Sequence, residues 1–432
     1  MQPEKVFKRY DVRGRYPEEL DEEFMERMGK SLGLFVREKF REEVVVSRDN
    51  KDSSKSLKES LIKGLTSTGV NVLDAGVGPT DFAAFHGQRN NTVSAQITSS
   101  HMPLNFNGLK LMYPKGNGFV NEDLDRVKDI FREGEFEAGK GNVSEIESAD
   151  GIYREEMIEF IRQFVQVENR KIVLETLGGA AEKFLSDILE EIGFEIINIA
   201  EEYEEHPYYD PPNPQPELLE HIPDRVEKEG ANMALATDMD GDRLSVYYDG
   251  DWISGDDLFC IFAQIFDGDI VASIDSSENL DLFADSIHYT RVGDPFVIDK
   301  MIEENAVLSG EPNGHYCFPG FTNYNSGILA ACLIAVTDLD PLLDKIPEKK
   351  IEKSNVETED KLRTMDKTIK EAKQRYDIIS DMDGVKFSYK DASVLVRPSG
   401  SSPAIRVKAE ADGNESTREA LEEAESLIRE NI

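Results

Sequence analysis

The segment 97–110 places two adjacent hydroxyls and an imidazole in one short stretch, at Ser99, Ser100 and His101. It follows an alternation of apolar and small polar residues at 93–96 that is typical of a strand, and its Pro, Asn and Gly residues turn a chain. We therefore predict a strand end followed by an exposed loop. Because hydroxyls in such turns usually bond their own backbone, a nucleophilic serine here requires complementary chemistry from other segments.

Three carboxylates alternate in a Gly-containing turn at Asp238, Asp240 and Asp242, directly after the apolar run 233–236. Carboxylates at this spacing can direct oxygens at one hard cation, and Mg²⁺ needs only a few such ligands. An EF-hand would need acidic residues continuing to a Glu at its twelfth position, whereas Arg243 and an apolar strand follow here. Because α/β folds place ligands at the carboxyl ends of strands, we favour a metal site over a solvated acidic turn.

A third loop, 309–315, offers one carboxylate, one amide and one imidazole, at Glu311, Asn313 and His315. Such groups suit sugar hydroxyls, which both donate and accept hydrogen bonds. Alone, the segment also fits an ordinary turn.

A fourth loop, 397–406, combines Arg397 and Arg406 with Gly and a run of hydroxyl side chains that includes Ser399 and Ser401. Exposed backbone N–H groups together with a guanidinium fork would bind a phosphate. A polar hairpin turn explains this segment equally well on its own.

The chain has 432 residues, which exceeds what one hydrophobic core organises and predicts about three domains. The longest apolar run, 327–336, is too short to span a membrane and predicts a buried helix. The start of the chain has no apolar signal region, so we expect a cytoplasmic protein. The three cysteines show no metal-type spacing and cannot form a disulfide framework.

The charge balance is strongly acidic: 49 basic and 86 acidic residues give 49 − 86 = −37. This argues against nucleic acid as a partner, and any anionic substrate requires Arg and Lys to converge in a cleft. The acidity is spread along the chain, which suggests the solvated surface of a halophilic protein, with a plainly acidic mesophilic protein as the alternative. The halophilic hypothesis predicts that the melting temperature rises between low and molar KCl. An unchanged melting temperature would contradict it.

The order strand, helix, strand recurs three times and predicts three consecutive α/β domains with mixed sheets. The tail differs, because its charged stretch 348–373 predicts a linker and a helix, followed by strands and a final helix in an α+β order. The predicted domains are 1–145, 146–247, 248–350 and 351–432. The tail strands are expected at 385–389, 393–396 and 405–410.

These segments together resemble the α-D-phosphohexomutase family and, within it, the phosphomannomutase/phosphoglucomutase group. The likeness covers 7–410 in the family's order, and the intact metal loop from Asp238 to Arg243 is its most specific match. It implies four domains around a central cleft in a monomer or homodimer. It also implies an isomerase that interconverts 1-phosphates and 6-phosphates of mannose and/or glucose through a phosphoserine and a bisphosphorylated sugar. No membrane or nucleic acid is expected as a partner.

The resemblance assigns the phosphoryl group to Ser100, fixed by His101, and Mg²⁺ to the phosphoserine and the three carboxylates of the Asp238 loop. Lys110 would be the general base, and Arg13 and Arg243 would lie beside the reacting phosphate. The expected substrate-binding residues are Glu311, Asn313, His315, Arg397, Ser399, Ser401 and Arg406.

Three departures from the family pattern bear on substrate preference: Met102 replaces the usual Asn, Asn313 the usual Ser, and Ser401-Ser402 the usual Thr-Glu. Two alternatives therefore stay open, a phosphoglucosamine mutase and a catalytically silent sugar-phosphate-binding protein. The opening residues 7–11 differ from those typical of the phosphoglucosamine branch. A serine hydrolase is poorly supported, because no Gly-x-Ser-x-Gly elbow surrounds Ser100.

Overall fold

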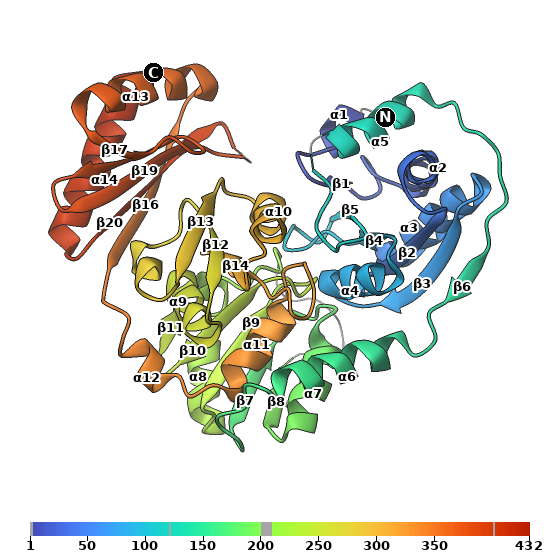
Figure 1. The fold of residues 1–432 in the computed structure, drawn as a ribbon, viewed down its shortest axis with the longest axis horizontal. Helices are drawn as coiled ribbons and strands as arrows, with labels where there is room; N and C mark the ends of the chain where they lie inside the picture. The colour runs from blue at the N-terminus through green and yellow to red at the C-terminus, as the bar shows by residue number, and fades with distance from the viewer. Residues whose placement is uncertain (1–2, 121, 200–209, 401) are drawn as a thin grey trace.

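Four sheets with their own helices follow one another along the chain in the computed structural model, which describes residues 3–120, 122–199, 210–400 and 402–432. Figure 1 shows the first three units side by side and the C-terminal unit at the upper left, across from the N-terminal unit. The predicted four-domain α/β architecture with mixed sheets is confirmed. In the ranges described, no helix combines the length and apolar character needed to cross a bilayer.

The first unit is a six-stranded mixed sheet in the order β1-β5-β4-β2-β3-β6. Its buried centre consists of runs rich in Val and Ala, such as Val44–Val46, which suit a sheet covered on both faces. The pairs β2–β3 and β2–β4 are parallel, whereas β4–β5 and β1–β5 are antiparallel. Its strands are β1 Val12–Arg15, β2 Glu43–Arg48, β3 Asn71–Val77, β4 Val93–Ile97, β5 Phe106–Met112 and β6 Val143–Glu145. Its helices are α1 Pro3–Val6, α2 Glu22–Lys39, α3 Asp52–Ser67, α4 Thr80–Asn90 and α5 Glu122–Glu133.

The second unit is a five-stranded sheet in the order β11-β10-β9-β7-β8. The strands β7, β8 and β9 are parallel, and β10 and β11 continue the sheet as an antiparallel hairpin. Its strands are β7 Lys171–Glu175, β8 Glu195–Asn198, β9 Met233–Thr237, β10 Leu244–Tyr248 and β11 Asp251–Ile253. Its helices are α6 Ala149–Ile161, α7 Glu182–Ile192 and α8 Ile222–Glu229.

The third unit is a four-stranded sheet in the order β13-β12-β14-β15. The run 327–336 is helix α11, and all ten of its residues are buried, as its composition predicts. The strands are β12 Asp269–Ser273, β13 Ser286–Thr290, β14 Leu308–Glu311 and β15 His315–Cys317. The helices are α9 Gly255–Ile265, α10 Asp294–Glu304, α11 Gly327–Val336 and α12 Asp340–Leu343.

The C-terminal unit is an antiparallel sheet in the order β16-β20-β19-β18-β17, covered by two helices. The prediction of a linker at the start of 348–373 is wrong, because β16 forms there and pairs with β20 over eight residues. As an edge strand with only one buried residue, β16 carries charges that hide it from a hydrophobic pattern. The strands are β16 Lys350–Glu357, β17 Asp377–Ser380, β18 Val385–Tyr389, β19 Ala392–Pro398 and β20 Ala404–Ala411. The helices are α13 Lys361–Arg375 and α14 Asn414–Arg429.

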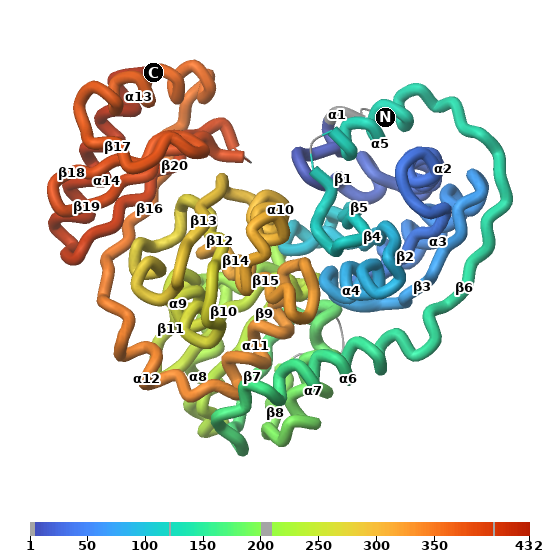
Figure 2. The backbone as a smooth tube through the Cα atoms, viewed as in Figure 1, coloured from blue at the N-terminus to red at the C-terminus, as the bar shows by residue number. Residues whose placement is uncertain are grey.

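The first three units share a hydrophobic core that the C-terminal unit does not join. One continuous core joins parts of the first three units, with α11 packed against α6 and α7, whereas the C-terminal unit has a core of its own. Figure 2 shows that the chain enters this last unit once, by the segment that leaves α12. The contact with the third unit is polar: Lys408 Nζ lies 3.1 Å from Asp256 Oδ2, and Ser277 Oγ donates to Glu410 at 2.6 Å. The C-terminal unit is therefore the part that can move against the rest with least loss of apolar contact.

The buried carboxylate of Asp81 contacts residues of all of the first three units. The hydroxyl of Tyr153 in α6 donates to Asp81 Oδ2 in α4 at 2.6 Å, and Ser326, which caps α11, bonds the same carboxylate. Burial raises the pKa of Asp81 from 3.8 to about 7. The ionised side chain is thus held in place at a cost in stability.

We expect Asp81→Asn to raise the melting temperature at pH 8 and to leave it unchanged below pH 4. The pKa of Asp81 is higher in the folded state, so between about pH 4 and pH 7 the folded protein binds a proton that the unfolded chain does not. Stability therefore falls as pH rises through this window in the parent but not in the variant. The difference should reach about 2–4 kcal/mol. A melting series from pH 4 to 8 measures it, and a difference that is constant with pH would contradict the assignment.

Candidate active site

The serine loop begins where β4 ends at Ile97 and is held by Lys51, whose ammonium donates to the carbonyls of Leu104 and Phe106 at 2.8 and 2.6 Å. Ser100 adopts a left-handed backbone conformation with φ 51°. Such a conformation is strained for a non-glycine residue and is commonly found at functional sites. Its N–H donates to Thr98 Oγ1 at 2.9 Å, which fixes the turn.

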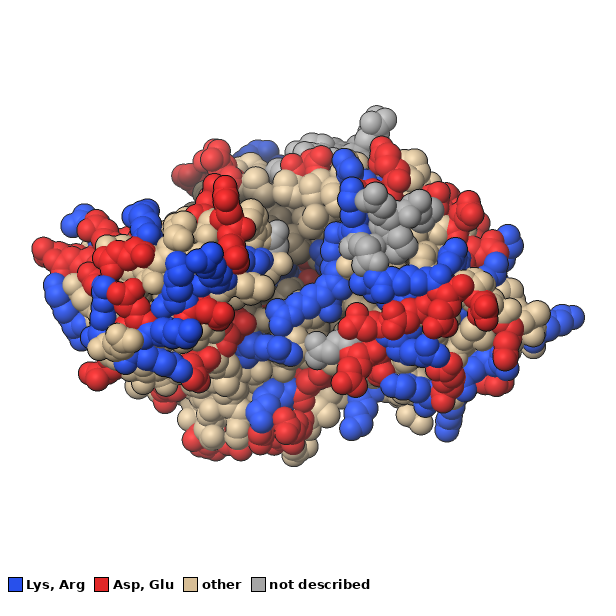
Figure 3. Space-filling view, turned by 90° about the horizontal axis from the view of Figure 1, so that it is seen from above, with Lys and Arg blue, Asp and Glu red and all other residues tan. Residues whose placement is uncertain are grey.

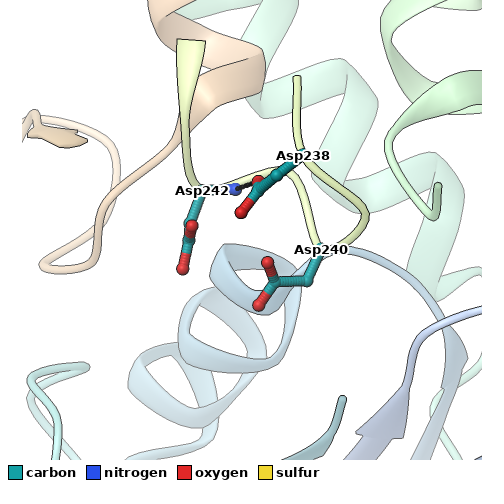
Figure 4. A group of neighbouring side chains, drawn as sticks. All are labelled: Asp238, Asp240 and Asp242. Carbon is teal, nitrogen blue, oxygen red and sulfur yellow. Dashed lines mark hydrogen bonds between the residues drawn. The ribbon is translucent and has the colours of Figure 1, made fainter. Parts of the chain in front are cut away.

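The acidic loop follows β9 and gathers three buried carboxylates. One oxygen of each of Asp238, Asp240 and Asp242 lies within 4.8 Å of the others. Figure 4 shows the three side chains converging from one turn, and the backbone N–H of Asp242 donates to Asp238 Oδ1 at 3.1 Å. Asp240 Oδ1 is buried without a hydrogen-bond partner among the described residues. An unpaired carboxylate oxygen in such a group fits a divalent cation with oxygen ligands.

The two loops meet. Ser100 Oγ donates to Asp238 Oδ2 at 3.2 Å, although the residues are 138 positions apart, and it lies 3.1 Å from His101 Nδ1. Ser100 is 2% exposed. Burial, Arg243 and Arg13 together lower the pKa of His101, so its imidazole is neutral. The serine hydroxyl, a neutral imidazole and the carboxylate cluster therefore share one pocket.

Lys110 of β5 supplies the positive charge beside the acidic loop. Its ammonium lies 2.7 Å from Asp240 Oδ2 and 2.6 Å from Asp242 Oδ2. Burial lowers the pKa of Lys110, but these two carboxylates outweigh burial and raise the pKa well above 10.5. The one ammonium is thus shared between two carboxylates and offsets only part of the negative charge of the acidic loop.

The acidic loop is positioned by the first turn of α4. Thr80 Oγ1 donates to Asp240 Oδ2 at 2.6 Å, and the Thr80 N–H donates to the Asp240 carbonyl at 2.9 Å. Both side chains are fully buried. Thr80 therefore fixes the direction of one carboxylate from a different unit of the fold.

We expect Thr80→Val to weaken Mg²⁺ binding about tenfold, because hydrogen bonds to metal ligands typically have effects of this size. Valine keeps the shape of threonine and removes the donor. Titration calorimetry with MgCl₂ measures the change, and Thr80→Ser, which keeps the hydroxyl, should retain the parent affinity. Equal Mg²⁺ affinity in the Val and Ser variants would contradict this role.

The β14–β15 turn brings the predicted sugar loop to the same place. His315 Nε2 lies 3.1 Å from Asp242 Oδ1, and His315 Nδ1 lies 3.5 Å from Glu311 Oε2. Burial lowers the pKa of His315, but Asp242 and Glu311 more than compensate and raise it to about 10. Glu311 also accepts a hydrogen bond from Gly293 N at 2.8 Å, which helps to hold its carboxylate next to His315. Asn313 Oδ1 accepts from His315 N at 3.2 Å.

Two adjoining cavities connect these groups and share Arg243. The smaller, of about 100 Å³, is lined by most of the predicted reacting groups but not by Asp238 or Asp240, and the larger, of about 1090 Å³, reaches the C-terminal unit. Figure 3 shows the molecule hollowed between the C-terminal unit on the left and the N-terminal unit on the right. The predicted residues that line the smaller cavity are Arg13, Ser100, His101, Lys110, Asp242, Arg243 and His315. Those that line the larger one are Arg243, Asn313, Arg397 and Arg406.

Of the residues predicted for the phosphate loop, Arg397 and Arg406 line the larger cavity. Arg397 and Arg406 face each other across the β19–β20 pair, and Arg397 lies 3.8 Å from Asp275 and 3.7 Å from Asp383. Ser399 is buried, bonded to the hydroxyl of Ser402, and is not among the residues lining the larger cavity. Ser401 lies outside the described residues.

Asp294 lines the smaller cavity and was missed by the sequence analysis. It begins α10 within Gly293-Asp294-Pro295, an ordinary helix start with no chemical signal. Burial raises its pKa to about 6. Its carboxylate forms no hydrogen bond or ion pair with the described residues, so it is available to a ligand in the cavity.

Sequence models of the phosphoglucomutase/phosphomannomutase family match the chain in four consecutive pieces. Its alpha/beta/alpha domains I, II and III match residues 4–138, 153–250 and 254–339, and its C-terminal domain matches residues 353–427. The chain belongs to this family. Its members are isomerases, the phosphohexomutases, which transfer phosphate intramolecularly, and the predicted family membership and enzyme class are confirmed.

Individual phosphohexomutases resemble the whole chain. A "Phosphoglucomutase/phosphomannomutase" of Thermococcus kodakarensis is 32% identical, with 99% of each chain covered. A "Probable phosphoglucosamine mutase" of Thermococcus gammatolerans is 28% identical, with 98% of this chain and 97% of that protein covered. The crystal structure of a phosphoglucomutase/phosphomannomutase family protein from Burkholderia thailandensis has a TM-score of 0.89 at 24% identity, covering 99% and 98% of the two chains. These matches support the fold and the family and leave the sugar open.

Proposed function

We propose that this phosphohexomutase interconverts hexose 1-phosphates and hexose 6-phosphates of mannose and/or glucose through a phosphoserine at Ser100. The single observation that carries the proposal is the 3.2 Å contact between Ser100 Oγ and Asp238 Oδ2, which joins a buried hydroxyl to a buried carboxylate cluster. The bond between Ser100 Oγ and phosphorus breaks as a bond from a sugar hydroxyl to phosphorus forms. The resulting bisphosphorylated sugar reorients in the cavity. The bond between its other phosphoryl group and the sugar oxygen then breaks as a bond from that phosphorus to Ser100 Oγ forms.

Asp238, Asp240 and Asp242, with a phosphoserine oxygen, would hold Mg²⁺. When bound, Mg²⁺ would supply positive charge that offsets the charge of the phosphoryl group. Lys110 would first release one proton to solvent, and its neutral Nζ would then accept the proton of the attacking hydroxyl. Arg13 and Arg243 flank the small cavity and stabilise the transferring group.

The larger cavity suits the sugar and the phosphate that does not react. Its volume of about 1090 Å³ exceeds what one hexose phosphate needs and leaves room for a bisphosphorylated sugar to turn. Arg397 and Arg406, with Ser399 and Ser401 of the same sequence segment, would bind the distant phosphate. Glu311, Asn313 and His315 would bind sugar hydroxyls. Hinging of the C-terminal unit would open and close the cavity.

One coupled assay compares the candidates: mannose, glucose and glucosamine 1-phosphates are supplied separately, and each 6-phosphate product is measured. We expect the highest kcat/KM with mannose or glucose 1-phosphate. Highest activity with glucosamine 1-phosphate would instead favour the phosphoglucosamine mutase, a function suggested by the name of the second relative described above. No turnover with any sugar, and no phosphate on Ser100 by mass spectrometry, would favour a silent sugar-phosphate-binding protein.

We also propose four domains with boundaries after residues 145, 247 and 350, a cytoplasmic location, and a halophilic origin for the net charge of −37. The even spread of acidic residues supports the last point, since concentrated salt screens their mutual repulsion. The KCl dependence of the melting temperature is its test.

A further inference from the structure

Two arginines next in sequence to residues that line the catalytic cavities form no ion pair within the part of the chain that the structure describes. Arg9 and Arg291 form no hydrogen bond or ion pair with the described residues, in a chain with 86 acidic residues. Arg9 is exposed and Arg291 is half-buried. Two guanidinium groups left unpaired in so acidic a protein are available to an external anion.

One aromatic ring positions both guanidinium groups. The Cζ atom of Arg291 lies 3.4 Å from the centroid of the Phe296 ring, and that of Arg9 lies 5.2 Å from the same centroid. Arg9 Cζ also lies 5.3 Å from the centroid of Tyr10, whose ring meets Phe296 edge to face at 5.3 Å. Phe296 is 7% exposed and thus fixed in the core. Stacking holds an arginine in place while its N–H groups stay free to donate.

The pair lies where three units meet. Arg9 precedes Tyr10, which lines the smaller cavity, and Arg291 precedes Val292, which lines the larger one. From the C-terminal unit, Asp383 accepts a hydrogen bond from Val292 N at 3.4 Å. Figure 3 shows Lys and Arg side chains bordering the hollow, whereas acidic and basic side chains alternate over much of the face around it. The pair is therefore directly next in sequence to residues of both cavities, although neither arginine itself lines one.

The carboxylates near Arg9 and Arg291 do not prevent the two guanidinium groups from binding a phosphate. Asp294 and Asp383 contribute to the charge around Tyr10, and Arg9 attracts Asp383 at longer range, but neither carboxylate forms an ion pair with Arg9 or Arg291. The carboxylate of Asp383 is 3.7 Å from Arg397 and is bonded to Val292 N. An incoming phosphate therefore does not have to displace an existing ion pair from either arginine.

The proposed reaction creates a need for such a site. A bisphosphorylated sugar must release the groups that hold both of its phosphates in order to turn, and at that moment the field of a molecule with net charge −37 drives it outward. We propose that Arg9 and Arg291 form a phosphate-holding site beside the two cavities that retains the bisphosphorylated sugar while it reorients. This inference rests on the proposed function.

The test compares two ligands on one background. In Ser100→Ala, which prevents phosphoryl transfer, the dissociation constants of glucose 1,6-bisphosphate and glucose 6-phosphate are measured by calorimetry with and without Arg9→Gln and Arg291→Gln. We expect the double substitution to weaken bisphosphate binding at least about tenfold, as expected for lost charge-assisted hydrogen bonds, and monophosphate binding no more than about twofold. The control, Arg162→Gln with Arg418→Gln, removes the same charge from exposed positions that line neither cavity and should change neither constant.

Unchanged bisphosphate binding would overturn the inference, and so would equal weakening of both ligands, which would indicate a general attraction for phosphate. If the parent protein with Ser100 intact shows mutase turnover while bisphosphate affinity is unaffected by the double substitution, this inference alone fails. If the parent has no turnover and the Ser100→Ala protein binds neither sugar phosphate, the proposed function fails and the inference falls with it. Melting temperatures of the variants within about 2 °C of their background establish that stacking on Phe296 was not needed for folding.

Discussion

Ser100→Ala is expected to reduce mutase turnover by at least about 10⁴-fold, because it removes the oxygen that would carry the phosphoryl group and no other group can replace a covalent nucleophile. The Ser100 hydroxyl is the one that contacts Asp238 Oδ2 in the carboxylate cluster. The measurement is the rate of hexose 1-phosphate conversion in a coupled assay with a bisphosphate activator present. Mass spectrometry of the purified parent should find phosphate on Ser100 and none in the variant.

Ser99→Ala is the matched control for this prediction. Ser99 is the adjacent hydroxyl in the same loop, buried like Ser100, but its Oγ accepts a hydrogen bond from Lys51 at 3.1 Å and makes no contact with the acidic loop. We expect it to keep most of the activity. Retained turnover in Ser100→Ala, or loss of turnover in Ser99→Ala alone, would remove Ser100 from the proposed role. Because serine already adopts the left-handed conformation at φ 51°, alanine adds little strain, and the melting temperature of Ser100→Ala should change only slightly.

The meeting of distant loops could be predicted because it follows from chain order. Ser100 follows the end of β4 and Asp238 follows the end of β9, and α/β folds bring functional loops to the carboxyl ends of strands. The chemistry of each loop was readable from residue types alone. What the pattern did not contain was which side chains would meet: the ion pairs of Lys110 with two carboxylates depend on packing between the first and second units.

One strand and three side chains could not be predicted from the hydrophobic pattern or the residue types of the sequence. The strand β16 is stabilised by backbone pairing with β20 and buries only one of its side chains, so its composition resembles a linker. Asp294 begins a helix in an unremarkable way, and only the packing of the third unit against the first brings it into the cavity. Arg9 and Arg291 differ from other basic residues in forming no ion pair with the residues that the structure describes, and a sequence pattern cannot show such a property.

Asp238→Asn is expected to reduce turnover by at least about 10³-fold and to abolish stabilisation by Mg²⁺. The substitution removes one of three converging carboxylates, together with the charged acceptor of the Ser100 hydroxyl. At 100 times its dissociation constant, a ligand that binds only the folded state stabilises it by about 2.7 kcal/mol. The parent should therefore melt at a higher temperature in excess MgCl₂ than in EDTA, whereas the variant should melt at the same temperature in both.

Without metal, Asp238→Asn should melt at the same temperature as the parent or higher. Burial and the neighbouring Asp242 and Asp240 raise the pKa of Asp238 well above its usual range, which means that its negative charge destabilises the metal-free fold. Asp249→Asn, an exposed change in the same unit, gives the same net charge of −37 + 1 = −36 and should retain both activity and the response to Mg²⁺. If Asp238→Asn lost activity but kept the full rise in melting temperature with MgCl₂, Asp238 would act on Ser100 and not as a metal ligand. Loss of both, with unimpaired stability in EDTA, is the combination that only a cation-binding carboxylate explains, because a merely structural residue would lower the melting temperature in either buffer.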